Sequence, residues 1–149
     1  MEVKASEFFT REEQDRIRDA VIAAESETSG EIRIHIESSL EGDVLDRASW
    51  IFTRIRMHKT EQRNGVLFYL AVSDRKFAII GDSGINAVVG NDFWDSVKDL
   101  MQERFRQGRF TDGLVEAVTM AGKKLKDHFP FTRDDVNELP DEISFDTPQ

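Results

Sequence analysis

One glycine-rich segment of the chain, residues 81–92, carries several oxygen-bearing side chains at short spacing. Its glycines allow backbone conformations with positive φ, so the segment can turn side chains and carbonyl groups toward a common point. Calcium and magnesium bind carboxylate, amide and carbonyl oxygens together with water. The spacing differs from that of an EF-hand loop, but the oxygen content favours a site for a hard cation. The side chains concerned are Asp82, Ser83, Asn86, Asn91 and Asp92.

Two more oxygen donors directly precede segments that we expect to be strands. Glu31 comes before the run IRIHI, and Asn64 comes before Gly65 and the run VLFYLAV. Parallel strands joined by a crossover start at the same end of a sheet, and a following antiparallel strand finishes there. We therefore expect these loops to meet at one rim of the sheet. The sequence predicts a Ca²⁺ or Mg²⁺ site at this rim, with four candidate ligands: Asp82, Asp92, Asn64 and Glu31.

Each of these residues also has a purely structural interpretation, which the sequence leaves open. Asp92 can be the N-cap of the helix that follows it, with Asp95 completing a pair that resembles a capping box. Asn64 and Gly65 can form a turn before a buried strand, and Glu31 can be an exposed residue at a strand start. The convergence on one rim, more than any single residue, favours the metal site.

Other kinds of chemistry have less support in the sequence. The chain has no cysteine, which excludes disulfides and thiolate chemistry. His35, His58 and His128 have no metal-pair spacing, and we expect all three on the solvated surface. No GxxxxGK[ST] loop, GxGxxG turn, GxSxG elbow or HExxH helix occurs. The catalytic residues of any enzyme activity are therefore undefined, and we expect no organic cofactor.

Composition sets the broad class of protein. A chain of 149 residues with 39% apolar and 33% charged residues is typical of one globular domain. Its net charge of -9 should repel nucleic acid and anionic membranes, which makes small cations the expected partners. No apolar run can span a bilayer, and the start MEVKASEFF lacks the sections of a secretory signal. We expect a monomeric, cytoplasmic protein.

The elements that would position this rim follow from hydrophobic periodicity. Thr10 and Glu13 form a capping box for a helix that ends near residue 26. The run IRIHI alternates isoleucines with polar side chains, which predicts a strand at a sheet edge or partly in solvent. Asp43 caps a crossover helix. The strand at 66–72 is then parallel to the first strand, and the strand at 77–80 is antiparallel to the second.

The second half of the chain is mainly helical. An apolar stripe from residue 92 stops at Gly108, and a further helix begins with Thr111 as its expected cap and ends before Pro130. The acidic segment 132–149 contains two prolines, so we expect a flexible tail outside a domain of residues 1–131. The predicted fold class is α/β, with a mixed, mostly parallel sheet, an antiparallel hairpin and helices on the faces of the sheet.

Three stretches of the chain carry a family resemblance. They are SGEIRIHI, NGVLFYLAVSDRKFAIIGDSGI and FRQGRFTDGL, which run from about Ser29 to about Leu114. In this order and spacing they resemble the TPM domain family of thylakoid-lumen, photosystem II repair and receptor-auxiliary proteins. The resemblance implies a three-layer α/β/α sandwich in which loops frame a crevice. By position, the implied site residues are Asn64, Asp82 and the acidic stretch around Asp92, while Asn86 stands where the family tends to have glutamate.

Three functional hypotheses follow from the residues and from the resemblance. The resemblance implies divalent-cation binding in the crevice, calcium especially, and the first hypothesis is a module that does only this. The second is a metal-assisted phosphatase, with an aspartate as general base and Arg33, Arg63 or Arg75 as the positive clamp. The third is an interaction scaffold that meets a membrane-protein partner, since the resemblance also implies roles in membrane-protein maintenance. The oxygen-rich rim favours the first hypothesis.

Overall fold

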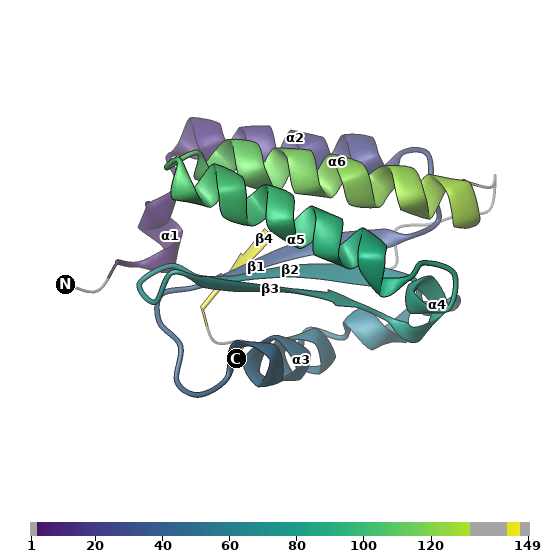
Figure 1. Ribbon diagram of the computed structural model, residues 1–149, viewed down its shortest axis with the longest axis horizontal. Coiled ribbons are helices and arrows are strands. Elements are labelled where there is room, and N and C mark those ends of the chain that lie inside the picture. The colour runs from purple at the N-terminus through teal and green to yellow at the C-terminus, as the bar shows by residue number, and fades with distance from the viewer. Residues whose placement is uncertain (1–2, 132–142, 147–149) are drawn as a thin grey trace.

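The computed structural model describes residues 3–131 and 143–146, and its strands form one sheet between helical layers (Figure 1). The strands are β1 (Glu31–Glu37), β2 (Gly65–Ala71), β3 (Lys76–Gly81) and β4 (Ile143–Phe145). The longer helices are α2 (Arg11–Glu25), α3 (Val44–Arg54), α5 (Asn91–Arg106) and α6 (Phe110–His128). Shorter helical segments are α1 (Ala5–Phe8), the 3₁₀ helix η1 (Met57–Lys59) and α4 (Ser83–Asn86).

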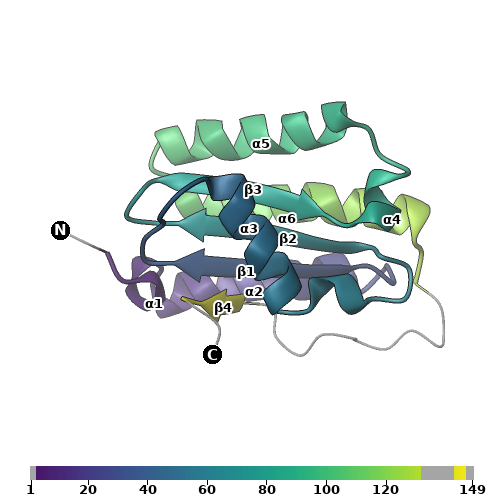
Figure 2. The same cartoon turned by 90° about the horizontal axis from the view of Figure 1, so that it is seen from below.

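The sheet has the strand order β3-β2-β1-β4. β1 is parallel to both β2 and β4, whereas β2 and β3 form an antiparallel hairpin. Helices α2, α5 and α6 lie on one face of the sheet, and α3 lies across the other (Figures 1 and 2). The predicted α/β class with a mixed, mostly parallel sheet is confirmed. Of the helices that the structure describes, none is long and apolar enough to cross a membrane.

Local capping interactions begin the first long helices where the sequence predicts them. The hydroxyl of Thr10 accepts a hydrogen bond from the Glu13 N–H (3.1 Å), and the Glu13 carboxylate accepts one from the Thr10 N–H (2.9 Å). The Asp43 carboxylate accepts the N–H of Asp46 at 3.0 Å. Both caps satisfy backbone donors that have no partner within the helix. After α5, Gly108 has a φ of +76°, a conformation in which glycine ends a helix at little cost.

Alternate residues of the central strands build two separate cores. The three isoleucines of β1 and Phe68 of β2 pack in the larger core, beneath α2, α5 and α6. Leu67 and Tyr69 of β2 pack in the smaller core, against Ile51 of α3. The other positions of β1 are polar, so the α3 side of β1 is a line of buried polar side chains.

The prediction that β1 is an edge or partly solvated strand was wrong. β2 pairs along one side of β1 and β4 along part of the other, so β1 is not an edge strand. All seven of its residues are buried, and its isoleucine face packs in the larger core. The prediction of a solvated His35 was also wrong: its side chain is 1% exposed, and its Nδ1 lies 2.6 Å from the Ser144 hydroxyl of β4. His58 is partly buried, and His128 is exposed as expected.

Two helix caps also differ from prediction. The N-cap of α5 is Gly90, and Asp92 lies within the first turn. The N-cap of α6 is Arg109, and Thr111 lies inside the helix. The Thr111 hydroxyl does not cap α6. It donates a hydrogen bond to the Glu13 carboxylate at 2.7 Å and so links α6 to α2.

The sequence did not predict the short elements α1, α4 and β4. Within the expected tail, residues 132–142 and 147–149 lie outside the described residues. The described part of that segment contains β4, whose Ile143 pairs with Ile34 of β1. The sheet therefore draws one strand from beyond residue 131.

Candidate functional site

The rim that the sequence predicted is formed where β1 and β2 begin and β3 ends. This is the end of the sheet at which α4 lies in Figure 1. The Glu31 N–H donates to the Asn64 carbonyl (3.4 Å), and the Asp82 N–H donates to the Gly65 carbonyl (3.0 Å). The backbones of three predicted ligands therefore lie on adjoining strand ends.

Asp82 is the most firmly held of these residues. The residue as a whole is 6% exposed. Its carboxylate caps α4 by accepting a hydrogen bond from the Ser83 N–H at 2.7 Å. The Arg63 guanidinium donates two hydrogen bonds to the same carboxylate, at 2.7 and 2.8 Å. These contacts raise the pKa of Arg63. Since the Arg63 side chain itself is 51% exposed, a buried carboxylate is paired with a cation that reaches it from solvent.

Asn64 is also buried, with 1% exposure, but its hydrogen-bond partners differ from those of Asp82. Its N–H donates to the Thr60 hydroxyl at 3.2 Å, and its Nδ2 donates to the Ser29 hydroxyl at 3.4 Å. Its Oδ1 is buried and accepts no hydrogen bond from any residue that the structure describes. A buried acceptor without a donor is costly, which marks this oxygen as available to a further ligand.

The pleat of the sheet determines which of these side chains share a face. A Cβ on Gly65 would meet Met57, on the α3 side, and a Cβ on Gly81 would meet Trp94, on the α5 side. Because side chains alternate along a strand and Asp82 follows Gly81, Asp82 and Glu31 lie on the α3 side. By the same alternation, Asn64 lies on the opposite side. Across residues 3–131 and 143–146, no three histidine or acidic side chains are grouped closely enough to hold a metal ion.

Asp92, the fourth predicted ligand, is exposed in the first turn of α5. Figure 1 places the start of α5 beside α4, at the same end of the molecule as the rim. Asn86 connects the two helices, because its amide donates to the Gly81 carbonyl (2.7 Å) and accepts the Trp94 indole N–H (2.9 Å). Asn86 therefore has a structural role that a glutamate could not fill in the same way.

A buried polar cluster beneath β1, at the other end of the strand, was not singled out by the sequence analysis. The Glu37 carboxylate accepts two hydrogen bonds from Arg47 of α3, at 2.8 and 2.6 Å, and one from the Tyr69 hydroxyl. Burial alone would raise the pKa of Glu37, but the hydrogen bonds from Arg47 and Tyr69 outweigh it and, with His35 nearby, lower the pKa to about 2. Burial and the Glu37 carboxylate raise the pKa of Tyr69.

The alternation of Arg33, His35 and Glu37 was the available signal for this cluster, and it was interpreted as a solvated face. The partners come from α3, β2 and β4, at sequence separations of 10, 32 and 109 residues. Such distances leave no local pattern. Both oxygens of the Glu37 carboxylate accept hydrogen bonds from Arg47 or Tyr69. This arrangement is typical of a charged residue that stabilises the fold.

Comparison with known proteins agrees with this architecture. The model of the TPM domain family matches residues 3–124. The chain is similar to the NMR structure of the BA42 protein from the psychrophilic bacterium Bizionia argentinensis, with 48% identity, coverage of 95% of this chain and 98% of that chain, and a TM-score of 0.88. No curated protein matches.

Two more distant structures show the same fold. The N-terminal domain of the cg2496 protein from Corynebacterium glutamicum is 13% identical, with coverage of 79% and 74% and a TM-score of 0.63. The N-terminal domain of a P. gingivalis protein is 16% identical, with coverage of 83% and 80% and a TM-score of 0.65. The family match over most of the chain, together with the similarity to BA42, shows that this chain belongs to the TPM domain family.

Proposed function

We propose that this TPM domain binds a divalent cation, Ca²⁺ or Mg²⁺, at the rim around Asp82. The observation that carries the proposal is the pairing of a buried Asp82 carboxylate with a half-exposed Arg63 guanidinium. The carboxylate requires a positive counter-charge, since an unpaired buried charge is costly. The Arg63 side chain is half exposed, so its guanidinium can turn into solvent and leave the Asp82 carboxylate to another cation. A metal ion can take its place.

The oxygens around Asp82 have the chemistry that a hard cation prefers. Glu31 lies on the same face of the sheet as Asp82, and Asp92 lies at the same end of the molecule. The buried Oδ1 of Asn64 faces the opposite side of the sheet, so it is not a ligand of the same ion as Asp82. Few fixed carboxylates gather at this rim, and Arg63 competes for Asp82. We therefore expect weak binding, with a Kd of about 10⁻⁴ to 10⁻³ M.

The proposal is tested by titrating Ca²⁺ into the metal-free protein and following backbone amide signals. We expect saturable shifts at residues 63–65 and 81–92. Asp82→Asn should abolish them, because asparagine still caps α4 but carries no charge. The matched control is Asp19→Asn, which removes one exposed carboxylate from α2 and should leave the response unchanged. Amide signals that stay constant up to about 10 mM Ca²⁺, or that still shift in Asp82→Asn, would refute the proposal.

A second candidate, a metal-assisted phosphatase, is favoured by the position of Arg63. The sequence offered three arginines as a clamp for the phosphoryl group. Arg33 is buried beneath the sheet, where it donates to the Ile55 carbonyl at 3.4 Å, and Arg75 lies in the β2–β3 turn at the opposite end. Arg63 alone of the three lies beside Asp82.

In this candidate mechanism Arg63 would leave Asp82 and pair with two phosphoryl oxygens through its planar fork of N–H donors. A bound cation would polarise a phosphoryl oxygen and lower the pKa of water. A rim carboxylate would accept the proton from the attacking water, the bond between phosphorus and the ester oxygen would break, and the leaving alcohol would take its proton from solvent.

Turnover of p-nitrophenyl phosphate with Ca²⁺ or Mg²⁺ tests the phosphatase separately from cation binding. We expect Asp82→Asn to abolish turnover, and Arg63→Gln to reduce turnover while keeping cation binding. Cation binding without turnover would refute the phosphatase and leave the binding module standing. Turnover that survives Asp82→Asn would exclude this rim as its source.

A further inference from the structure

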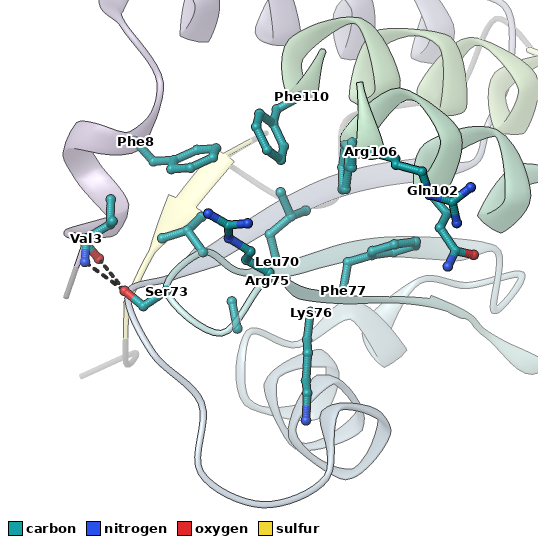
Figure 3. Close-up of a pocket in the computed structure, with 13 residues that line it drawn as sticks. Val3, Phe8, Leu70, Ser73, Arg75, Lys76, Phe77, Gln102, Arg106 and Phe110 are labelled. Atoms are coloured by element: carbon teal, nitrogen blue, oxygen red, sulfur yellow. Dashed lines mark hydrogen bonds between the residues drawn. The ribbon is translucent and has the colours of Figure 1, made fainter. Parts of the chain in front are cut away.

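A cavity of about 620 Å³ opens at the end of the sheet opposite the rim. It lies where β2 turns into β3, between α1, the end of α5 and the start of α6 (Figure 3). The N-terminal segment borders it, held there by the Val3 N–H, which donates to the Ser73 hydroxyl at 2.7 Å. This end also contains the carboxyl ends of the parallel strands β1 and β2, the usual position of ligand sites in α/β sheets.

Aromatic rings form the inner wall of the cavity. Phe8 meets Phe110 edge to face at 5.1 Å between ring centroids, and Phe105 meets Phe77 at 5.3 Å and Phe110 at 5.3 Å. All four rings are only partly buried, so each keeps apolar surface toward the cavity. Leu70 contributes to the lining from β2. Covering this surface with an apolar group would be favourable, because it removes apolar area from water.

The charged residues of the lining are all basic. Arg75, Lys76 and Arg106 are present, and none of the acidic residues within 3–131 and 143–146 contributes, although the whole chain carries a net charge of -9. Arg106 has a partner in Glu103, at 3.4 Å. Lys76 extends toward the α3 side in Figure 3, away from Phe8 and Phe110. The charge available to a ligand is therefore concentrated on Arg75.

Arg75 is held in a conformation that directs it to the cavity. Its φ of +54° places it in the left-handed region, at the β2–β3 turn. Figure 3 shows its guanidinium on the side of the turn where Phe8 and Phe110 lie. In the described part of the chain, no hydrogen bond or ion pair is made by this guanidinium. The planar Arg75 guanidinium, with its five N–H donors, therefore lies beside the phenylalanine rings. A guanidinium can bind a carboxylate through two parallel hydrogen bonds.

We propose that this cavity binds a small amphipathic carboxylate, with the carboxylate group paired to Arg75 and the apolar body against the phenylalanine wall. The volume is within the range of small-molecule sites, and a few polar groups in an apolar pocket fix the orientation of a ligand. The site is independent of the metal rim, since the two lie at opposite ends of the sheet.

The test uses 4-phenylbutyrate, which has a ring, a short aliphatic chain and a carboxylate. Titration into the full chain should shift the amide signals of residues 70–77 and 105–110, with saturation below about 10 mM. The neutral 4-phenylbutanamide and the ring-free acetate should each bind at least about tenfold more weakly, because each lacks one half of the interaction. Raised ionic strength should weaken 4-phenylbutyrate binding, since Arg75 is exposed.

Arg75→Asn is the decisive variant, because asparagine tolerates a positive φ and keeps the turn. We expect it to weaken 4-phenylbutyrate binding roughly tenfold or more. Arg11→Gln, which removes one exposed charge from α2, is the matched control and should bind as the parent chain does. Equal binding of the carboxylate and the amide, equal binding by Arg75→Asn and Arg11→Gln, shifts confined to other residues, or no shift at all would each overturn the proposal.

Discussion

Replacing Glu37 by glutamine should destabilise the fold in a way that depends on pH. Glutamine keeps the shape of the side chain but removes the charge that Arg47 and Tyr69 bind. The pKa of Glu37 falls from 4.5 to about 2 on folding, and each pKa unit corresponds to about 1.4 kcal/mol. The ionised carboxylate thus contributes about 3 kcal/mol at neutral pH.

The sign of the pH dependence follows from the lowered pKa. The contribution is fully present above pH 4.5 and is lost as the pH falls toward 2, where the folded protein also takes up the proton. We therefore expect Glu37→Gln to be less stable than the parent chain by about 3 kcal/mol at pH 7, with a difference that shrinks toward zero near pH 2.

Urea unfolding followed by circular dichroism measures this difference at several pH values. The matched control is Glu41→Gln, an exposed carboxylate in the loop before α3, which should change stability by less than about 0.5 kcal/mol. A Glu37→Gln variant as stable as the parent chain at pH 7 would refute the reasoning. A deficit of the same size at pH 7 and pH 2.5 would show that lost packing, and not the charge, is responsible.

Two further predictions concern the rim. A Cβ on Gly84 would clash with the Gln62 carbonyl oxygen and lie 2.6 Å from that of Arg63, so Gly84→Ala should lower the unfolding free energy by about 1–3 kcal/mol in thermal melts. Gly90→Ala, where a Cβ would meet no atom within 4 Å, should lose less, only the small cost of alanine at the N-cap of α5, and equal losses would contradict this account. Arg63→Gln should strengthen Ca²⁺ binding at Asp82 in calorimetric titrations, because the competing guanidinium is gone; weaker binding would mean that Arg63 supports the cation.

Much of the fold could be predicted because its signals are local. The capping pair Thr10 and Glu13 and the Asp43 cap depend on residues three apart, and they start α2 and α3 as expected. The buried run of β2 and its hairpin with β3 were equally clear, since apolar periodicity is a short-range property. The parallel pairing of β1 and β2 followed from the helical crossover between them.

The burial of β1 could not be predicted, because its polar side chains are satisfied by distant residues. Arg47 neutralises Glu37 from α3, and Ser144 meets His35 from β4. Before these partners are known, alternating charged and apolar residues indicate a solvated face. The sequence contains these partner residues, but it does not show that they contact β1 in the folded protein.

At the rim, topology predicted which backbones meet but not which side chains face one another. The ends of β1, β2 and β3 adjoin, as expected. The alternation of side chains nevertheless separates Asn64 from Asp82 and Glu31, which depends on the residue-by-residue register. The Arg63–Asp82 pair also escaped prediction, since its two residues lie 19 positions apart in the sequence.

The pairing of β4 with β1 has a consequence for how the chain is made. During synthesis β1 leaves the ribosome more than 100 residues before Ser144, its neighbour across the sheet. Until then the outer edge of β1 presents open backbone donors and acceptors to other nascent chains. Local elements can form early, but the closing of this edge must wait for β4, and contacts of such long sequence separation form slowly.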